Sequence, residues 1–171
     1  MRAPGHEAGR SDRPRWTVVP FVSVGSLRFG MSHGEVVAAL GATPPVAWRP
    51  GSPAEFGDAA VTTYYGDSGR LMCVAVDAFR GPQVVLEDLS PAGCEPTELE
   101  DRFTRYAESR RAEVCHSQDG SWGSEELGLV IRTQRAGDLL LTRPVFVARE
   151  WAPGVADAQL GFVPQEEWAV R

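Results

Sequence analysis

The chain has 171 residues, an apolar content of 43% and a formal net charge of −6 at pH 7. This apolar content is enough for a folded core and excludes a chain that is disordered throughout. The acidic balance, with arginines scattered along the chain, argues against nucleic-acid binding, which requires a basic surface. No apolar run is long enough to span a membrane, so we expect neither nucleic acid nor a membrane as a partner.

The residue composition indicates the source of the protein and its cellular location. All 17 basic residues are arginine, and the sequence has no lysine and no asparagine, a bias typical of high-G+C bacteria such as actinobacteria. The three cysteines lack Cys-x-x-Cys spacing, so no zinc site is expected, and the sequence predicts no other metal and no cofactor. With an odd cysteine count and no hydrophobic signal segment, we expect reduced thiols and a cytoplasmic protein.

The N-terminal region is expected to change from disorder to strand near residue 16. Residues 1–15 are polar and rich in Gly, Pro and Arg, which predicts a disordered tail. Residues 16–24 are strand-like, and Pro20 among them predicts an edge strand or a bulge. The remaining chain, residues 16–171, is predicted to form a single domain.

A helix with clear start and stop signals lies within residues 24–41. Ser32 and Glu35 have the spacing of a capping box, in which each side chain bonds the backbone N–H of the other residue. Apolar residues follow at helical spacing, and Gly41 stands where a left-handed residue ends a helix. The flanking glycines do not form a phosphate-binding pattern, so a turn and a cap are the favoured interpretation.

Residues 42–58 contain four prolines and are predicted to form a loop. Trp48 and Phe56 within this loop have two interpretations. They pin the loop to the body of the domain, or they form part of a contact surface. Of the two, pinning is favoured, and the contact surface stays open as the functional alternative.

A first β-hairpin follows this loop. Residues 60–65 and 71–78 flank a Gly-Asp-Ser-Gly turn, and both segments are rich in strand-forming residues. Cys73 lies in an apolar part of the second strand and is expected in the core. Residues 83–87 are predicted to form a third strand.

The second half of the chain again begins with a helix. Residues 96–111 open with a proline and acidic residues, as helix starts commonly do, and residues 113–117 are predicted to form a short strand. A second hairpin pairs residues 127–133 with residues 139–147. Pro144 in its second strand predicts an edge position or a bulge.

The two halves suggest an internal repeat. Gly30 and Gly93 occupy matching places before the two helices, and each helix is followed by a hairpin. This order predicts tandem helix-plus-hairpin units over residues 24–88 and 89–150.

A C-terminal extension of residues 151–171 follows the second unit. Its Trp151 and Trp168 either pack on the domain or bind a partner. The whole pattern predicts an α+β fold, with two helices on one face of a mostly antiparallel sheet.

Residues 29–32 read Phe-Gly-Met-Ser and are followed by Glu35-Val36 and Leu40-Gly41. This stretch resembles the opening of small domains of the SmpA/OmlA and β-lactamase-inhibitor-protein type, and of a group of uncharacterised actinobacterial proteins. The resemblance implies a helix-plus-antiparallel-sheet fold that binds other proteins without catalysis. The chain lacks the signal peptide and lipobox-type cysteine of the secreted and lipoprotein members, so a periplasmic or extracellular role does not carry over.

No catalytic site is predicted. Cys115 and His116 are adjacent, but neighbours on a strand point to opposite faces, so they are not expected to act as nucleophile and base. Carboxylate pairs suited to acid–base chemistry sit at predicted strand ends and loops, where solvated charge is the simpler interpretation. These pairs are Glu87-Asp88 and Glu125-Glu126.

We therefore expect a non-catalytic protein-binding module, such as an immunity-type or inhibitor-like protein, that contacts its partner through aromatic side chains. The candidate contact residues are Trp48, Phe56, Tyr64, Trp122 and Trp151. The alternative is a small-molecule-binding protein or an enzyme with a pocket between sheet and helices. Polar groups expected in such a pocket are Tyr64, Arg132 and His116. Self-association is a third interpretation.

Overall fold

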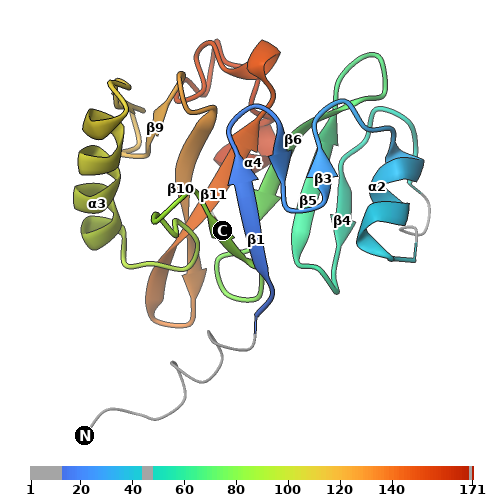
Figure 1. The fold of residues 1–171 in the computed structure, drawn as a ribbon, viewed down its shortest axis with the longest axis horizontal. Helices are drawn as coiled ribbons and strands as arrows, with labels where there is room; N and C mark the ends of the chain where they lie inside the picture. The colour runs from blue at the N-terminus through green and yellow to red at the C-terminus, as the bar shows by residue number, and fades with distance from the viewer. Residues whose placement is uncertain (1–12, 44–47, 170) are drawn as a thin grey trace, which may run out of the picture.

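The structure, a computed structural model, describes residues 13–43, 48–169 and 171. Within them, three α-helices and two mostly antiparallel sheets form an α+β fold (Figure 1), which confirms the predicted fold class. The larger sheet has seven strands and the smaller has four. Among the described residues, we find no helix with the length and apolar character that crossing a membrane requires.

The seven-stranded sheet has β6 and β11 at its centre. Its strands, in spatial order, are β4 (Ala54–Phe56), β5 (Val61–Tyr65), β6 (Leu71–Val76), β11 (Leu139–Val147), β10 (Leu129–Ala136), β9 (Trp122–Ser124) and β8 (Cys115–His116). Neighbouring strands of this sheet are antiparallel, and Ala75 of β6 lies opposite Val145 of β11. Both predicted hairpins are therefore present and meet at the centre of one sheet.

The four-stranded sheet combines the N-terminal region with a strand from the middle of the chain. Its order is β3 (Leu27–Arg28), β2 (Ser23–Val24), β1 (Arg15–Val19) and β7 (Gln83–Val85). The β7 strand, predicted over residues 83–87, pairs in parallel with β1, placing Val84 opposite Trp16. The structure thus adds a second sheet to the one that the sequence predicted.

Pro20 ends β1 and does not lie inside a longer strand. The chain turns at Phe21, whose φ is 68°, and β2 then runs back antiparallel to β1. Because proline has no N–H to donate to a ladder, the strand ends where Pro20 stands. The prediction of one strand over residues 16–24 was wrong for this reason.

The two longer helices begin and end at the signals in the sequence. Helix α2 (His33–Leu40) has the predicted capping box between Ser32 and Glu35, and Gly41 follows it with φ 58°. Helix α3 (Pro96–Ser109) starts after Glu95, whose carboxylate accepts hydrogen bonds from backbone N–H groups of the first turn. It ends two residues before the predicted end at residue 111.

One face of the seven-stranded sheet carries α2, α3 and the four-stranded sheet. Val36 of α2, Phe103 of α3 and Val84 of β7 lie in one apolar cluster with Val74 and Ile131 of the large sheet. The two helices stand at opposite ends of this face, with the small sheet between them (Figure 1). The prediction that both helices share one face is confirmed.

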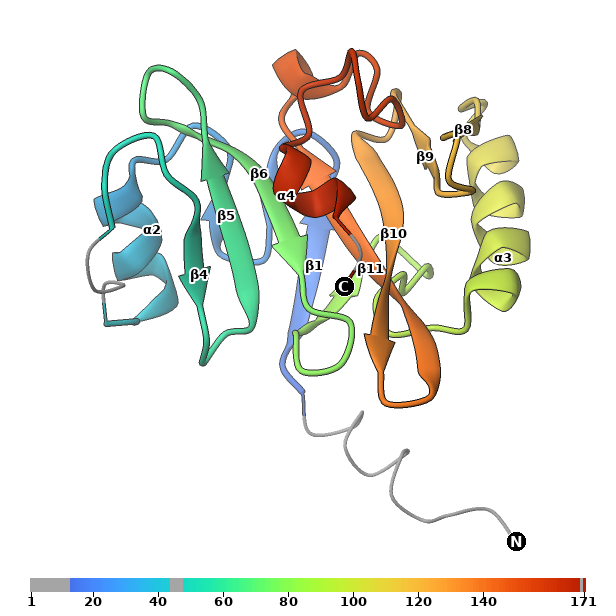
Figure 2. The same cartoon turned by 180° about the vertical axis from the view of Figure 1, so that it is seen from behind.

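The opposite face is covered by the C-terminal segment, which contains the 3₁₀-helix η1 (Arg149–Trp151) and helix α4 (Gln165–Trp168) (Figure 2). Val155 and Val163 of this segment pack in a second apolar cluster with Cys73 and Val130 of the sheet. The C-terminal extension therefore packs on its own domain. Cys73 is fully buried, as its apolar strand predicted.

Pro144 lies in a strand of the sheet interior, but at a position where β11 is paired on one side only. It lies opposite Ile131 of β10, whereas the pairing of β11 with β6 begins one residue later, at Val145. The proline thus stands just outside the β6 ladder, where a backbone N–H is not required. The predicted edge position is therefore confirmed at Pro144 itself, although the strand as a whole lies inside the sheet.

The predicted disordered tail, residues 1–15, falls mostly outside the described residues, which begin at Arg13. Its last residues are ordered, which corrects the boundary. Arg13 donates hydrogen bonds from its guanidinium to the carbonyl groups of Phe79 and Gly81, both at 3.0 Å, and Arg15 begins β1.

Candidate functional site

The five residues predicted to contact a partner do not form one surface. Phe56, Tyr64 and Trp122 are buried, with 4%, 3% and 3% of their surface exposed, and Trp48 and Trp151 are half-buried. Phe56 and Trp122 belong to the apolar cluster beneath α2 and α3, whereas Tyr64 belongs to the cluster on the opposite face. Of these five, Trp48 and Trp151 retain surface open to solvent.

Trp48 packs against the start of α2. Its ring stacks on the imidazole of His33, with the ring centroids 3.7 Å apart, and its Nε1 donates to the Ser52 carbonyl at 2.9 Å. The Nδ1 atom of His33 lies 3.0 Å from the Tyr65 hydroxyl, and burial lowers the pKa of this histidine. These contacts hold the segment before β4 against the domain, in line with the pinning interpretation of Trp48.

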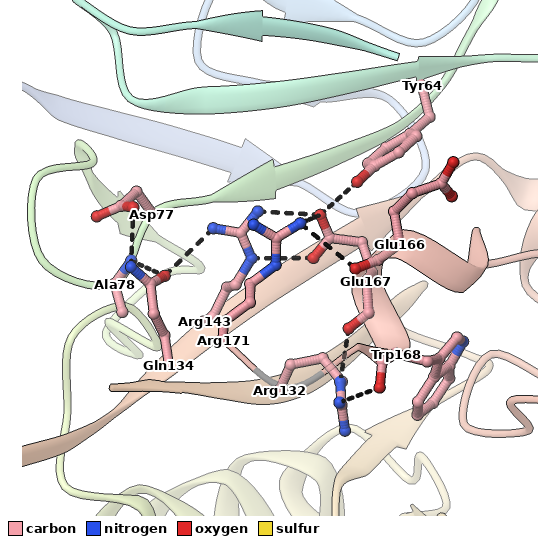
Figure 3. A network of polar contacts seen from close by, with 10 residues as sticks. All are labelled: Tyr64, Asp77, Ala78, Arg132, Gln134, Arg143, Glu166, Glu167, Trp168 and Arg171. Carbon is pink, nitrogen blue, oxygen red and sulfur yellow. Dashed lines mark hydrogen bonds and ion pairs between the residues drawn. The ribbon is translucent and has the colours of Figure 1, made fainter. Parts of the chain in front are cut away.

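Tyr64 belongs to a buried polar network beneath the C-terminal helix (Figure 3). Its hydroxyl donates to Oε1 of Glu167 in α4 at 2.5 Å. Arg143 of β11 donates two hydrogen bonds to the same carboxylate, from Nε to Oε2 and from Nη2 to Oε1, each at 2.9 Å. The side chain of Arg143 is 3% exposed and that of Glu167 is fully buried. A bidentate, buried pair of this kind combines strong attraction with a large cost of desolvation.

Arg143 is oriented by residues that lie outside the C-terminal segment. Its Nη1 donates to Oε1 of Gln134 at 3.2 Å, and Nε2 of Gln134 donates to Asp77 at 2.9 Å. The backbone N–H of Ala78 donates to the same Gln134 oxygen at 3.1 Å. The guanidinium is therefore held from the sheet side as well as by Glu167.

A second arginine of the same face, Arg132 of β10, binds backbone carbonyl groups of α4. Its Nε donates to the carbonyl of Glu167 at 2.9 Å and its Nη2 to that of Trp168 at 3.0 Å. Its guanidinium also lies 4.8 Å from the centre of the Trp168 ring and forms an ion pair with Asp119. The Ser121 hydroxyl accepts a hydrogen bond from Arg132 Nη1 at 2.7 Å. The Arg132 side chain is therefore also held by residues outside the C-terminal segment.

Burial and charge set the ionisation of this network. Burial alone would raise the pKa of the Glu167 carboxyl, but the hydrogen bonds and charge of Arg143 outweigh it and hold that pKa below its ordinary value. Burial and the neighbouring Glu167 carboxylate raise the pKa of Tyr64 well above its ordinary range. Near neutral pH the site thus contains a carboxylate, a neutral phenol and cationic arginines.

Sequence reasoning named Tyr64 and Arg132 as convergent polar groups and missed the two residues between them, Arg143 and Glu167. The third named group, His116, lies elsewhere, with its Nε2 atom 3.2 Å from Glu100 of α3. A signal for Arg143 was present, because it stands in a strand that is otherwise apolar around residues 144–147. Glu167 carried none, since charged residues in a polar C-terminal stretch are ordinarily solvated.

Cys115 and His116 do not combine into a nucleophile and base. Cys115 packs against the apolar cluster beneath the C-terminal segment, while His116 contacts Glu100 on α3. Burial, followed by the nearby Glu125 and Glu126 carboxylates, raises the pKa of the Cys115 thiol. A reactive thiolate needs the opposite shift.

A cleft of about 530 Å³ opens beside this pair, between β8 and the C-terminal segment. Its carboxylates already have partners within the chain. Asp119 pairs with Arg132, Glu125 Oε1 accepts from the Gly154 N–H at 2.8 Å, and Asp157 accepts from two backbone N–H groups of its own loop. Among the described residues, no three His, Cys, Asp or Glu side chains gather as a metal ion would require.

A loop of the C-terminal segment presents apolar side chains to solvent. Leu160 is 86% exposed and Phe162 is 52% exposed, and the Phe162 ring stacks on that of Trp151 with centroids 6.2 Å apart. The loop backbone is fixed, because Asp157 accepts from the N–H groups of Gln159 and Leu160 at 2.9 and 3.0 Å. We call Trp151, Leu160 and Phe162 the apolar loop.

Comparison with protein-family models, with curated proteins and with solved structures found no match to this chain. Its function is therefore argued from the polar network, the cleft and the apolar loop themselves.

Proposed function

We propose that this chain is a non-catalytic protein-binding module whose contact surface is the apolar loop. The observation that carries the proposal is the exposure of Leu160, at 86%, and Phe162, at 52%. The backbone of this loop is already held by hydrogen bonds from its N–H groups to the Asp157 carboxylate. Apolar side chains on an ordered loop lose little conformational freedom when a partner covers them. Trp151, stacked on Phe162, adds the type of aromatic anchor that interfaces favour.

The charge of the chain favours a basic partner. The net charge is −6, and opposite charge accelerates association and selects among partners. The carboxylates of Asp157 and Glu125 lie beside the apolar loop and line the neighbouring cleft. A protein with an apolar pocket rimmed by basic side chains fits this surface, as expected for an immunity-type or inhibitor-like protein that neutralises a basic target.

A cytoplasmic, reducing location is part of the proposal. Cys73 and Cys115 form no disulfide, and cysteines outside disulfides are typical of proteins in reducing compartments.

A tandem origin of the two halves is the last part of the proposal. Helix α2 is followed by β4, β5 and β6, and helix α3 by β8, β9, β10 and β11. Strands β6 and β11, the second strands of the two hairpins, pair at the centre of the sheet, where Ala75 lies opposite Val145, and the first unit ends with a further strand, β7. This arrangement supports units 24–88 and 89–150 as descendants of one helix-plus-hairpin element.

Affinity capture with matched variants tests the contact surface. A tagged chain would be exposed to the lysate of its native host, in parallel with a Leu160→Asp/Phe162→Asp variant. The control is Leu139→Asp/Leu140→Asp, because these side chains are 44% and 46% exposed at the far end of the β10–β11 hairpin. We expect a basic protein that the wild type and the control retain and the loop variant loses. Retention by all three chains, or by none, would exclude the apolar loop as the contact.

The alternative is a small-molecule-binding protein, and the cleft lined by His116, Asp119 and Trp168 is the observation that favours it. Its volume of about 530 Å³ is in the range of ligand sites. A metabolite extract that shifts the NMR signals of these residues, and leaves those of the apolar loop in place, would favour this alternative over protein binding.

A further inference from the structure

The buried polar network around Glu167 has the composition of a peptide-binding site that helix α4 occupies. Its donors, Tyr64, Arg132 and Arg143, come from β5, β10 and β11 of the sheet. Its acceptors are the carboxylate of Glu167 and the carbonyl groups of Glu167 and Trp168, all in α4. The sheet thus supplies donors and α4 supplies acceptors, and Arg171, which follows α4, adds a further donor with its Nη2 3.4 Å from Oε1 of Glu167.

The donors are positioned without help from the segment. Gln134 and the Ala78 N–H fix the far side of Arg143, and Asp119 and Ser121 fix Arg132. Removing the segment would therefore leave two oriented guanidinium groups and a phenol on the sheet face, spaced for a carboxylate and two carbonyl groups. Planar guanidinium groups suit this bidentate recognition.

The segment itself has little structure of its own. Helix α4 has four residues, which is too few for helical stability in isolation. Gln165, Glu166 and Ala169 are exposed, so Glu167 and half of Trp168 make up most of what the helix buries. The polar site and the packing of Trp168 against the apolar cluster of the sheet therefore attach this helix together. A hydrophobic pair could attach a helix without the desolvation cost of a buried ion pair, so the charged pair selects for a carboxylate.

We propose that the face formed by Tyr64, Arg132 and Arg143 is a binding site for an acidic peptide segment, and that residues 164–169 are its resident ligand, which an acidic segment of a partner protein replaces. The incoming segment places a glutamate or aspartate side chain on Arg143 and Tyr64 and its next carbonyl groups on Arg132. Because the resident segment is part of the same chain, its effective concentration at the site is high. A partner segment can therefore bind only when the resident segment has detached. This site is separate from the apolar loop, and each can fail without the other.

Peptide binding to full-length chains tests the site. The probe is a fluorescent peptide with the sequence of residues 160–171, and a second peptide carries Gln in the place of Glu167. The proteins are the wild type, Glu167→Ala, and Glu166→Gln as the matched control, because Glu166 is the exposed neighbour in the same helix. We expect Glu167→Ala to bind the first peptide about tenfold or more tightly than the wild type and the control do, and the Gln peptide to lose about tenfold or more of that affinity. Equal binding in all combinations would overturn the proposal.

Hydrogen exchange of the wild type keeps the test decisive if the Glu167→Ala chain fails to fold. We expect the amides of residues 165–169 to exchange about tenfold or more faster than those of β11, because the segment detaches while the sheet stays folded. Equal protection of the two regions would mean that the segment leaves only on global unfolding, and the proposal would be wrong. Dimers that form in the wild type and disappear in Glu167→Ala would assign the site to a second copy of the chain, and would likewise overturn the partner assignment.

Discussion

Glu167 attaches helix α4 to the sheet, and its burial also costs free energy of desolvation. Its carboxylate meets Arg143 twice and Tyr64 once within 2.9 Å, yet all three side chains give up their hydration to do so. Each buried charge is compensated as long as it has its partner. When one partner is removed, the other remains buried and unpaired, and the full cost of desolvation appears.

Glu167→Gln should therefore destabilise the fold, although the change conserves shape. We expect the free energy of unfolding to fall by about 3 kcal/mol, because Arg143 stays buried without a counter-charge. Urea denaturation at pH 7 measures the loss. Glu166→Gln, on the exposed side of the same helix, should change stability by less than about 0.5 kcal/mol. Equal effects of the two substitutions would show that the ion pair contributes nothing.

The same pair predicts a dependence on pH. The pKa of Glu167 is lower in the folded chain than its ordinary value of about 4.3. The carboxylate therefore stabilises the fold fully above that value, and its contribution is lost as the pH falls toward the lower folded pKa. We expect the stability difference between the wild type and Glu167→Gln to shrink steadily as the pH falls below about 4.3. A difference that stays constant over this range would rule out Glu167 as a titrating contributor.

At the scale of elements, the helix ends were the most predictable features of the chain. The capping box of α2 and the proline and Glu95 at the start of α3 act within one turn of backbone, so the local sequence is sufficient to specify them. The hairpins could be predicted for the same reason.

Elements that depend on distant partners could not be predicted in this way. The parallel pairing of β7 with β1 joins residues 15–17 to residues 83–85. The site joins Arg143 to Glu167, and no local pattern distinguishes this buried glutamate from the exposed Glu166 beside it. Pro144 shows a related point, because the proline rule found a position unpaired on one side, but could not tell that the rest of the strand lies inside the sheet.

The cap of α2 provides a prediction at this scale. Ser32→Ala removes the hydroxyl that accepts from the Glu35 N–H at 3.2 Å. We expect a loss of about 1 kcal/mol in the free energy of unfolding, and Ser32→Thr should restore most of it because it keeps the hydroxyl. Thermal denaturation of the three chains measures both effects. If Ser32→Thr were as unstable as Ser32→Ala, the hydroxyl would not be the stabilising group.

For the whole molecule, the pairing of β6 with β11 joins the two halves of the chain in one sheet. Phe146 in β11 is 2% exposed and lies opposite Val74 of β6. Phe146→Ala should reduce the free energy of unfolding by about 3 to 5 kcal/mol through loss of packing and the cavity it leaves. Because the apolar cluster is shared, we expect the amides of α2 and α3 to report the same reduced stability in native-state hydrogen exchange. A change confined to α3 would show that the halves unfold separately.

The position of α4 after the strands of both sheets has a consequence for folding. Because β5, β10 and β11 precede residues 164–169 in the chain, the sheet face can form before α4 docks on it, while Arg143 still lacks the carboxylate that covers it. In that state Arg132 keeps its ion pair with Asp119, whereas Arg143 is a cation without its Glu167 partner. Docking of α4 therefore changes the charge of this face, and a partly folded chain with α4 undocked should be attracted to anionic surfaces more strongly than the native protein.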